Sequence, residues 1–374
     1  MNYQIVESLR CRHGAFDVDS RGCPMVRKVV LAAVAFVAIV LGSVVVPTSA
    51  GAVVDNATIV PSPNAGTSSD RLLSVSCVSA SDCVAVGATN TGSVVETLAM
   101  VWDGSVWSIV SSPNAGTSND QLRSVSCVSA TECVAVGYTN TGSALETLVM
   151  VWDGSVWSIV SSPNAGTSSD ALFSVSCVSA TECVAVGRTF TGVIETLVMV
   201  WNGSVWTIVS SPNAGTSNDE LYSVSCVSAT ECVAVGYTNA GSTLETLVMV
   251  WDGSVWTIVS SPSPGTGNDE LIWVSCVSAT ECVAVGRTFT GSVSETLVMV
   301  WDGSVWSIVS SPNAGTSSDE LYSVSCVNAS ECVAVGFTDT GNNAYETLVM
   351  SLTGPEPTPT TTIASDQVSP AFTG

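Results

Sequence analysis

A cassette of about fifty residues repeats six times along this chain, and it constrains the fold more than any other feature. Its most constant parts read S-V-S-C-V-S-A-T-E-C-V-A-V-G and W-D-G-S-V-W. The first cysteines of the six C-x5-C pairs follow one another at intervals of 49 or 50 residues. A constant period over most of a chain indicates one supersecondary unit that is stacked repeatedly.

Each cassette contains four short segments that are typical of β-strands. In the second copy they span residues 122–128, 132–139, 146–152 and 156–161, all rich in Val, Ile, Thr and aromatic residues and bounded by turn formers. Asp153-Gly154 between the last two segments predicts a hairpin with a type I′ turn, because that turn needs positive φ. Four antiparallel strands per cassette therefore form the expected unit.

Six such units predict an all-β fold, a six-bladed β-propeller of four-stranded antiparallel blades. The strands containing V-A-V and L-V-M-V are continuous apolar runs, as expected when neighbouring blades cover both faces. Residues 57–63 match only a fourth strand, and the last cassette ends at its third strand, residues 346–352. We expect the N-terminal segment to complete the last blade and close the ring, which removes open sheet edges. A linear solenoid is the alternative, but no terminal cassette has the polar outer face of a cap.

The paired cysteines bracket the turn between the first and second strands of each unit, which sets the two thiols opposite each other. We therefore predict six disulfides. Metal binding by the thiolates is the alternative, but two cysteines that bind zinc are usually closer together in sequence than C-x5-C. The pairs are Cys77–Cys83, Cys127–Cys133, Cys177–Cys183, Cys226–Cys232, Cys276–Cys282 and Cys326–Cys332.

The N-terminal region has the pattern of a secretory signal. Arg27 and Lys28 precede an apolar run over residues 29–46, and Ala50-Gly51-Ala52 matches an A-x-A cleavage site. We expect a leader over residues 1–52 with translation starting at Met25, a propeller over 53–354, and a Pro/Thr-rich disordered tail over 355–374. The predicted location is extracellular or on the cell surface. An uncleaved signal segment is the alternative, and it would be the only contact with a membrane.

The charge balance after residue 52 excludes several classes of function. Only Arg71, Arg123, Arg188 and Arg287 oppose 29 acidic residues there, which gives a net charge of −25. Nucleic acid is therefore an unsuitable partner, since phosphate binding needs clustered cations. The single histidine, His13, and the single lysine lie in the leader. Histidine-dependent triads, lysine Schiff bases and histidine-ligated zinc are excluded from the exported part.

The W-D-G-x-V-W hairpin resembles the Asp-box of sialidase-like propellers, S-x-D-x-G-x-x-W, which also lies at a turn between third and fourth strands. The match is partial, because Asp103 stands four residues before Trp107 rather than five and Val101 replaces the leading Ser. Residues 57–352 are also similar to secreted actinobacterial repeat proteins that carry S-C-x-S-x-x-x-C-x-A-V-G. The resemblance implies a propeller and no particular activity, and the arginines of sialidases have no matching positions here.

Positions that differ between the cassettes are candidates for specificity. One set precedes S-V-S-C and the other follows V-A-V-G, and both are dominated by aromatic residues and arginine, which are enriched in recognition surfaces. The candidate binding residues are Arg123, Phe173, Tyr222 and Tyr322 in the first set, and Tyr138, Arg188, Tyr237, Arg287 and Phe337 in the second. Leu73, Ile272 and Ala88 complete the sets, and Trp273 replaces a serine. Drift after recent duplication is the alternative explanation.

Two acidic residues and two tryptophans also recur in each cassette. The acids could ring a channel and hold calcium, or the Asp residues could end the loop before the first strand and the Glu residues could start the third. They are Asp120, Asp170, Asp219, Asp269 and Asp319 with Glu146, Glu195, Glu245, Glu295 and Glu346. We expect the structural role and no cofactor. Trp102 and Trp107 are expected to pack across their hairpin, with a sugar-stacking platform as the alternative.

These patterns together predict a monomeric extracellular binding module for a glycan or cell-surface polymer. One alternative is a hydrolase or lyase that uses channel carboxylates such as Glu146, Glu245 and Glu346. Unlike residues must converge in a catalytic site, whereas the repeats present the same ones. A purely structural surface protein is the other alternative.

Overall fold

The computed structural model describes residues 60–66, 69–116, 118–215, 217–315, 318–328, 330–339 and 345–353. The chain divides into residues 1–58 and a compact unit that begins at Ile59 and holds every described residue. The predicted leader and Pro/Thr-rich tail lie outside the described residues. Within the described part, no helix is long and apolar enough to cross a membrane.

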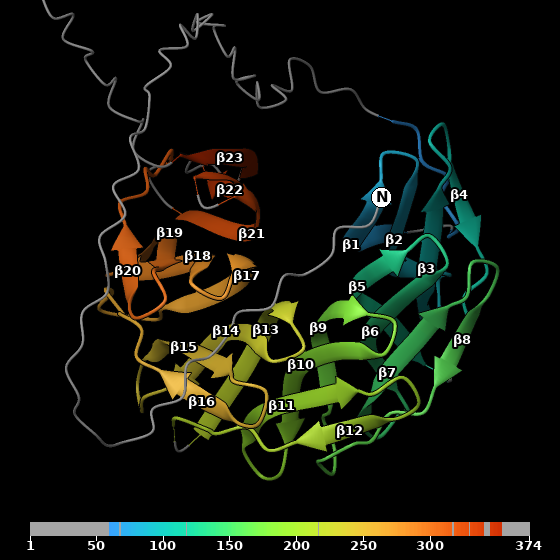
Figure 1. Cartoon of the computed structure of the whole chain (residues 1–374), viewed down its shortest axis with the longest axis horizontal. Coiled ribbons are helices and arrows are strands. Elements are labelled where there is room, and N and C mark those ends of the chain that lie inside the picture. Colours follow the sequence, from blue (N-terminus) through green and yellow to red (C-terminus); the bar gives the residue numbers. More distant parts are fainter. Residues whose placement is uncertain are drawn as a thin grey trace, which may run out of the picture. The chain divides into compact units, whose positions relative to one another are not determined.

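The described unit is all-β and consists of consecutive antiparallel blades (Figure 1). Blades 1 to 5 have four strands each, as the cassettes predict, and blade 6 has three described strands. Blade 1 contains β1 (Ser69–Ser79), β2 (Asp82–Asn90), β3 (Val95–Trp102) and β4 (Trp107–Val110); blade 2 contains β5 (Asn119–Ser129), β6 (Glu132–Asn140), β7 (Leu145–Trp152) and β8 (Trp157–Val160); blade 3 contains β9 (Ala171–Ser179), β10 (Glu182–Phe190), β11 (Ile194–Trp201) and β12 (Trp206–Val209). Blade 4 contains β13 (Ser217–Ser228), β14 (Glu231–Asn239), β15 (Leu244–Trp251) and β16 (Trp256–Val259); blade 5 contains β17 (Glu270–Ser278), β18 (Glu281–Thr290), β19 (Val293–Trp301) and β20 (Trp306–Val309); blade 6 contains β21 (Ser318–Asn328), β22 (Glu331–Asp339) and β23 (Tyr345–Thr353).

The disulfide prediction is confirmed in all six cassettes, where each pair of cysteines joins the first strand to the second. In blade 2, Cys127 lies directly opposite Cys133 in the register of β5 and β6. Six disulfides in one chain indicate that the protein folds in an oxidising environment, as expected for an extracellular protein.

Close approach of the first two strands requires a glycine in every blade. In blade 2, a Cβ on Gly137 would lie 1.9 Å from the backbone oxygen of Gln121 on the neighbouring strand. A register shift occurs between Leu122 and Ser124 on β5, beside this glycine. The invariant glycine of V-A-V-G is therefore explained by the geometry of this bulge.

The predicted hairpin between third and fourth strands is present, but its turn is not of type I′. Trp152 pairs with Trp157, which leaves a four-residue loop, and only Gly154 in that loop has positive φ. The Asp153 carboxylate explains the difference, because its Oδ1 accepts hydrogen bonds from the backbone N–H groups of Ser155 and Val156 at 2.8 Å. These bonds satisfy backbone donors that a two-residue turn would not expose.

The two tryptophans of each complete cassette pack across this hairpin, as predicted. Their ring centroids lie 5.5–5.6 Å apart in blades 1 to 5. The first tryptophan also donates its indole N–H to the turn between the first two strands, as Trp152 does to the Ala130 oxygen at 3.2 Å. These contacts tie the outer hairpin of a blade to its disulfide-bonded hairpin.

The hydrophobic core lies between blades rather than in one centre. Between blades 1 and 2, Val84 and Val86 of β2 pack against Leu122 and Val125 of β5, and the same set recurs at each following junction. Such burial explains why the strands are apolar on both faces. The described core therefore confirms stacked blades.

Serine side chains connect the first strands of consecutive blades. The Val175 N–H donates to Ser124 Oγ at 3.2 Å, and the Cys177 N–H donates to Ser126 Oγ at 3.0 Å. In blades 1 to 4 the S-V-S-C motif thus gives the first strand two acceptors for the next one, a role that its sequence alone did not indicate. Equivalent bonds link blades 1 and 2, 3 and 4, and 4 and 5.

Blades 1 and 6 each leave one apolar face open. Leu72 of blade 1 is 44% exposed and Val349 of blade 6 is 67% exposed, although their counterparts in the other blades are buried. Residues Val60–Asn64 lie in no strand and are exposed. Closure of the six units remains a prediction.

Candidate functional site

One cavity of about 460 Å³ is lined by residues from all six blades, and we call it the six-blade cavity. Its walls come from the first strand of every blade and from β18. The lining residues are Leu72, Leu73, Arg123, Phe173, Tyr222, Glu270, Ile272, Trp273, Arg287 and Tyr322. Every residue that varies immediately before the first serine of S-V-S-C therefore lines the same cavity.

Of the nine binding residues predicted from the sequence, five line this cavity: Arg123, Phe173, Tyr222, Arg287 and Tyr322. The other four come from the set that follows V-A-V-G. Arg188, Tyr237 and Phe337 contact cavity-lining residues, whereas Tyr138 donates a hydrogen bond to the Gln121 side chain. The structure thus places all four residues of the first set and Arg287 of the second set in the cavity lining, and three more of the second set in contact with lining residues.

Ion pairs lie in the cavity wall and next to it. The Arg287 guanidinium donates to Glu270 Oε2 and to Glu320 Oε2, both at 2.9 Å. Arg188 pairs with Glu220 Oε1 at 2.6 Å. All three carboxylates are buried, with side chains between 4% and 9% exposed. Buried charges of this kind stay ionised only when partners satisfy them.

Burial and neighbouring charges shift the pKa values of groups in this cluster. Desolvation raises the pKa of the Glu270 carboxyl, although Arg287 opposes the change. Burial alone would lower the pKa of the Arg287 guanidinium, but Glu270 and Glu320 raise it above its usual range. Burial and the negative charge of Glu320 raise the pKa of Tyr322 to about 12, so this phenol stays neutral and can donate a hydrogen bond. It donates to Glu320 Oε2 at 3.0 Å.

Aromatic rings cover the adjoining wall. The Tyr222 ring lies between those of Phe173 and Tyr237, at centroid distances of 6.0 and 5.6 Å. The guanidinium groups of Arg123 and Arg188 lie 5.6 and 5.7 Å from the centroid of Phe173. Aromatic faces beside fixed charges are typical of a ligand pocket.

The carboxylates of Glu220, Glu270 and Glu320 are not among the binding residues predicted from the sequence. A usable signal was present, because the residue after the repeated Asp varies between cassettes as much as the two sets that were singled out. It is Arg71, Gln121, Ala171, Glu220, Glu270 or Glu320. In the register of the first two strands this residue pairs with the residue after V-A-V-G, so Glu270 lies opposite Arg287 and Glu220 lies opposite Tyr237.

The repeated acids do not gather around the cavity. Each repeated Asp caps the loop that precedes its first strand, as Asp120 does by accepting a hydrogen bond from the Gly116 N–H at 3.0 Å. Glu146, Glu245 and Glu346 lie near the start of the third strands and are absent from the cavity lining. Within the described residues, no group of three or more His, Cys, Asp or Glu side chains could hold a metal ion.

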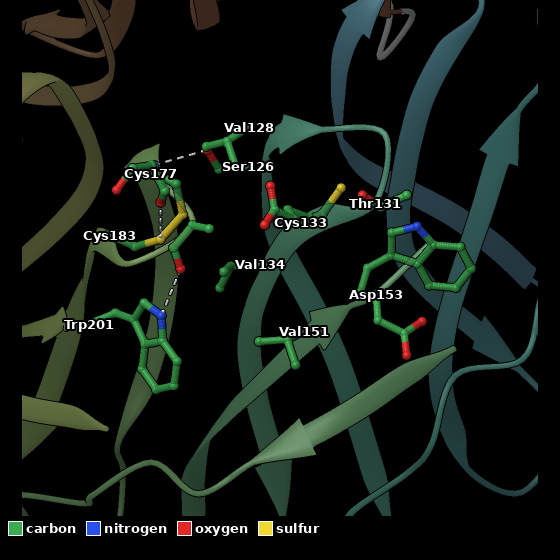
Figure 2. A pocket seen from close by; sticks show the side chains of 14 residues that line it. Ser126, Val128, Thr131, Cys133, Val134, Val151, Asp153, Cys177, Cys183 and Trp201 are labelled. Atoms are coloured by element: carbon green, nitrogen blue, oxygen red, sulfur yellow. Dashed lines mark hydrogen bonds between the residues drawn. A yellow bond between two sulfur atoms is a disulfide. The ribbon is translucent and has the colours of Figure 1, made fainter. Parts of the chain in front are cut away.

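A second kind of hollow lies between successive blades near their disulfides, and we call it the interblade groove. Figure 2 shows the one between blades 2 and 3, where the Cys177–Cys183 disulfide and the Trp201 ring face Val134 and Val151. Its volume is about 440 Å³. Equivalent grooves lie between blades 3 and 4, 4 and 5, and 5 and 6.

Comparison with known proteins identifies no family. No family model and no curated protein matches the chain. Among solved structures, the chain is similar to an unknown function protein from Dyadobacter fermentans DSM 18053, with 10% identity, a TM-score of 0.48, and coverage of 75% of this chain and 93% of that one.

Two other similar structures have a bound ligand named with them. YCF48 bound to D1 peptide shares 14% identity, with a TM-score of 0.43 and coverage of 71% and 74% of the two chains. A mutant of Aleuria aurantia lectin in complex with alpha-methyl-L-fucoside shares 14% identity, with a TM-score of 0.41 and coverage of 62% and 75%. Likeness at such identities and TM-scores transfers no ligand to this chain.

Proposed function

We propose that this protein is a secreted, monomeric binding module whose six-blade cavity takes a saccharide unit of a glycan or cell-surface polymer. The observation that carries the proposal is the convergence of unlike residues on one cavity. Four aromatic side chains, Phe173, Tyr222, Trp273 and Tyr322, share its wall with the Glu270–Arg287 ion pair. Phe173, Tyr222, Tyr322 and Arg287 stand at positions that vary between otherwise nearly identical blades, and Trp273 replaces a serine.

The chemistry of the wall fits a sugar ring. Sugars present apolar C–H faces that pack on aromatic rings, and hydroxyl groups that both donate and accept hydrogen bonds. The cavity supplies rings for the first and a carboxylate beside a guanidinium for the second, in a fixed geometry that costs little to organise. The cavity volume of about 460 Å³ falls within the range of small-ligand sites.

The domain boundaries and compartment belong to the same proposal. Residues 1–52 are a cleaved leader, residues 53–354 form the propeller, and residues 355–374 form a linker-like tail. The disulfides in every cassette support export, because they persist in oxidising compartments.

Closure of the six blades is also proposed. The exposed face of blade 1, with Leu72 and Val75, carries the residues that are buried at every described junction between blades. The exposed face of blade 6, with Val335 and Val349, carries the matching residues of the opposite wall. Residues 57–63 would supply the fourth strand of blade 6 beside β23.

The test is binding of the oxidised, purified protein to an array of glycans and cell-wall polysaccharides, followed by calorimetry on any ligand found. The diagnostic variant is Trp273→Ser, which restores the serine that the other cassettes carry and removes one aromatic wall. Val156→Ser, in an exposed turn that does not line the cavity, is the matched control. We expect saturable binding that Trp273→Ser weakens by about tenfold and the control leaves unchanged.

A blank array, or a hit that both variants bind equally, would refute saccharide binding in this cavity. Turnover of the bound glycan would instead support the hydrolase or lyase alternative. In that case Glu270→Gln should abolish turnover, because the cavity wall contains this carboxylate.

A further inference from the structure

The interblade grooves repeat one set of chemical groups. Each groove is lined by apolar strand residues of one blade, the disulfide of the next blade and a glutamate. The glutamates are Glu132, Glu182, Glu231 and Glu281 in the four grooves from blade 2 onward. None of these grooves contains a residue of the six-blade cavity.

Two indole rings line each of the first three grooves. They are Trp152 and Trp201 between blades 2 and 3, Trp201 and Trp251 between blades 3 and 4, and Trp251 and Trp301 between blades 4 and 5. The volumes of these grooves are about 440, 150 and 180 Å³. The groove between blades 5 and 6 contains one indole, that of Trp301, because Leu352 occupies the position of the second tryptophan. The volume of this groove is about 70 Å³.

The polar groups of the groove favour a ligand that donates hydrogen bonds. The Trp201 indole N–H already donates to the Ala180 oxygen at 3.0 Å, so the ring offers a ligand its aromatic face. The Glu132 carboxylate accepts a bond from Ser129 at Oε2 and keeps Oε1 for a further donor, as judged from the bonds of the described residues. The other grooves repeat both features with Glu182 and Glu231.

The charge of the grooves and of the whole protein favours hydrogen-bond donors that are cationic. No lysine or arginine lines any of the four grooves, and Arg188 and Arg287 are held in ion pairs at the cavity. The exported part carries a net charge of −25. A surface of this sign raises the local concentration of cationic partners and steers them toward it.

From these observations we propose that the interblade grooves bind the cationic side chains of a basic polypeptide, with the ammonium or guanidinium group between the glutamate and an indole face. The alkyl stem would pack on the valines and the disulfide, as long cationic side chains commonly do on apolar surfaces. An aromatic face attracts a cation, and the adjacent carboxylate completes the site. The proposal is independent of saccharide binding in the six-blade cavity.

The experiment measures binding of an oligolysine peptide to the oxidised full chain by calorimetry at physiological salt. Its fully Nε-acetylated form has the same backbone without the charges. The variant Glu132→Gln/Glu182→Gln/Glu231→Gln removes one carboxylate from each two-indole groove. Its charge-matched control, Glu146→Gln/Glu195→Gln/Glu245→Gln, removes three carboxylates that line no groove.

We expect the groove variant to bind oligolysine about tenfold or more weakly than the unsubstituted protein, and the control variant to bind it less than about twofold more weakly. The acetylated peptide should bind none of the three proteins. Equal weakening by both variants would overturn the proposal, because it would show attraction by net charge alone. Undiminished binding of the acetylated peptide, or competition by a neutral polysaccharide for the same grooves, would also overturn it. Trp201→Leu, which removes an indole shared by two grooves, gives an independent measurement and should weaken oligolysine binding without a change in net charge.

Discussion

Ring closure can be tested by truncating two leucines that occupy the same position in different blades and comparing the loss of unfolding free energy. Leu221 is fully buried between blades 3 and 4, whereas the equivalent Leu72 on the open face of blade 1 is 44% exposed. Truncating either leucine to alanine removes the same atoms, so the packing around each leucine determines how much the free energy of unfolding falls.

The expected magnitudes differ clearly between an open and a closed arrangement. Leu221→Ala removes a buried side chain and leaves a cavity, which should lower the free energy of unfolding by about 3 kcal/mol. At a half-exposed site, Leu72→Ala loses only part of the transfer free energy, about 1 kcal/mol, and creates no cavity. If blade 6 covers blade 1, the cost of Leu72→Ala should rise to about 3 kcal/mol and match that of Leu221→Ala.

The assay is unfolding in guanidinium chloride, followed both by circular dichroism and by tryptophan fluorescence. The quantity compared is the shift of the midpoint at unchanged slope. We expect equal shifts for Leu72→Ala and Leu221→Ala. A cost of about 1 kcal/mol or less for Leu72→Ala, beside a full cost for Leu221→Ala, would refute closure. A cost below about 1 kcal/mol at Leu221 would refute the description of the interblade core itself.

Three further predictions concern single contacts. Ser124→Ala leaves the buried Val175 N–H without its acceptor and should lower stability by about 1–3 kcal/mol in chemical denaturation; a neutral result would contradict the serine connection between blades. Cys177→Ser/Cys183→Ser should lower stability by about 2 kcal/mol, because the disulfide restricts only a short loop in the unfolded chain, and an unchanged midpoint would show that it adds nothing. Hydrogen bonds from the Val156 backbone and from Ser155 lower the pKa of Asp153 below the usual aspartate value, so the stabilisation by this carboxylate is complete above about pH 4 and is lost as the pH falls through the lowered pKa. An acid titration should show less loss in Asp153→Asn, since Asn202 already forms the same turn in blade 3; identical acid profiles would contradict this role.

Part of the candidate site could be found from the sequence. Positions that vary within a near-perfect repeat indicated Phe173, Tyr222 and Arg287, and the structure places them on one cavity. Glu270 was missed because the predicted first strand begins one residue after this position, as it does at residue 122 in the second cassette. Only the pairing of β17 with β18, which sets Glu270 opposite Arg287, shows that the two residues form one charged unit.

The elements that depend on near neighbours could be predicted from the repeat alone: four strands per cassette, the hairpins at Asp-Gly, and disulfides between cysteines six residues apart. These features follow from contacts made within a single blade, so the local pattern is sufficient. The tertiary structure alone decided which varied residues meet, since the residues lining the six-blade cavity come from cassettes about fifty positions apart. Their convergence depends on how successive blades pack on each other, and that packing is set by side chains of two blades at once.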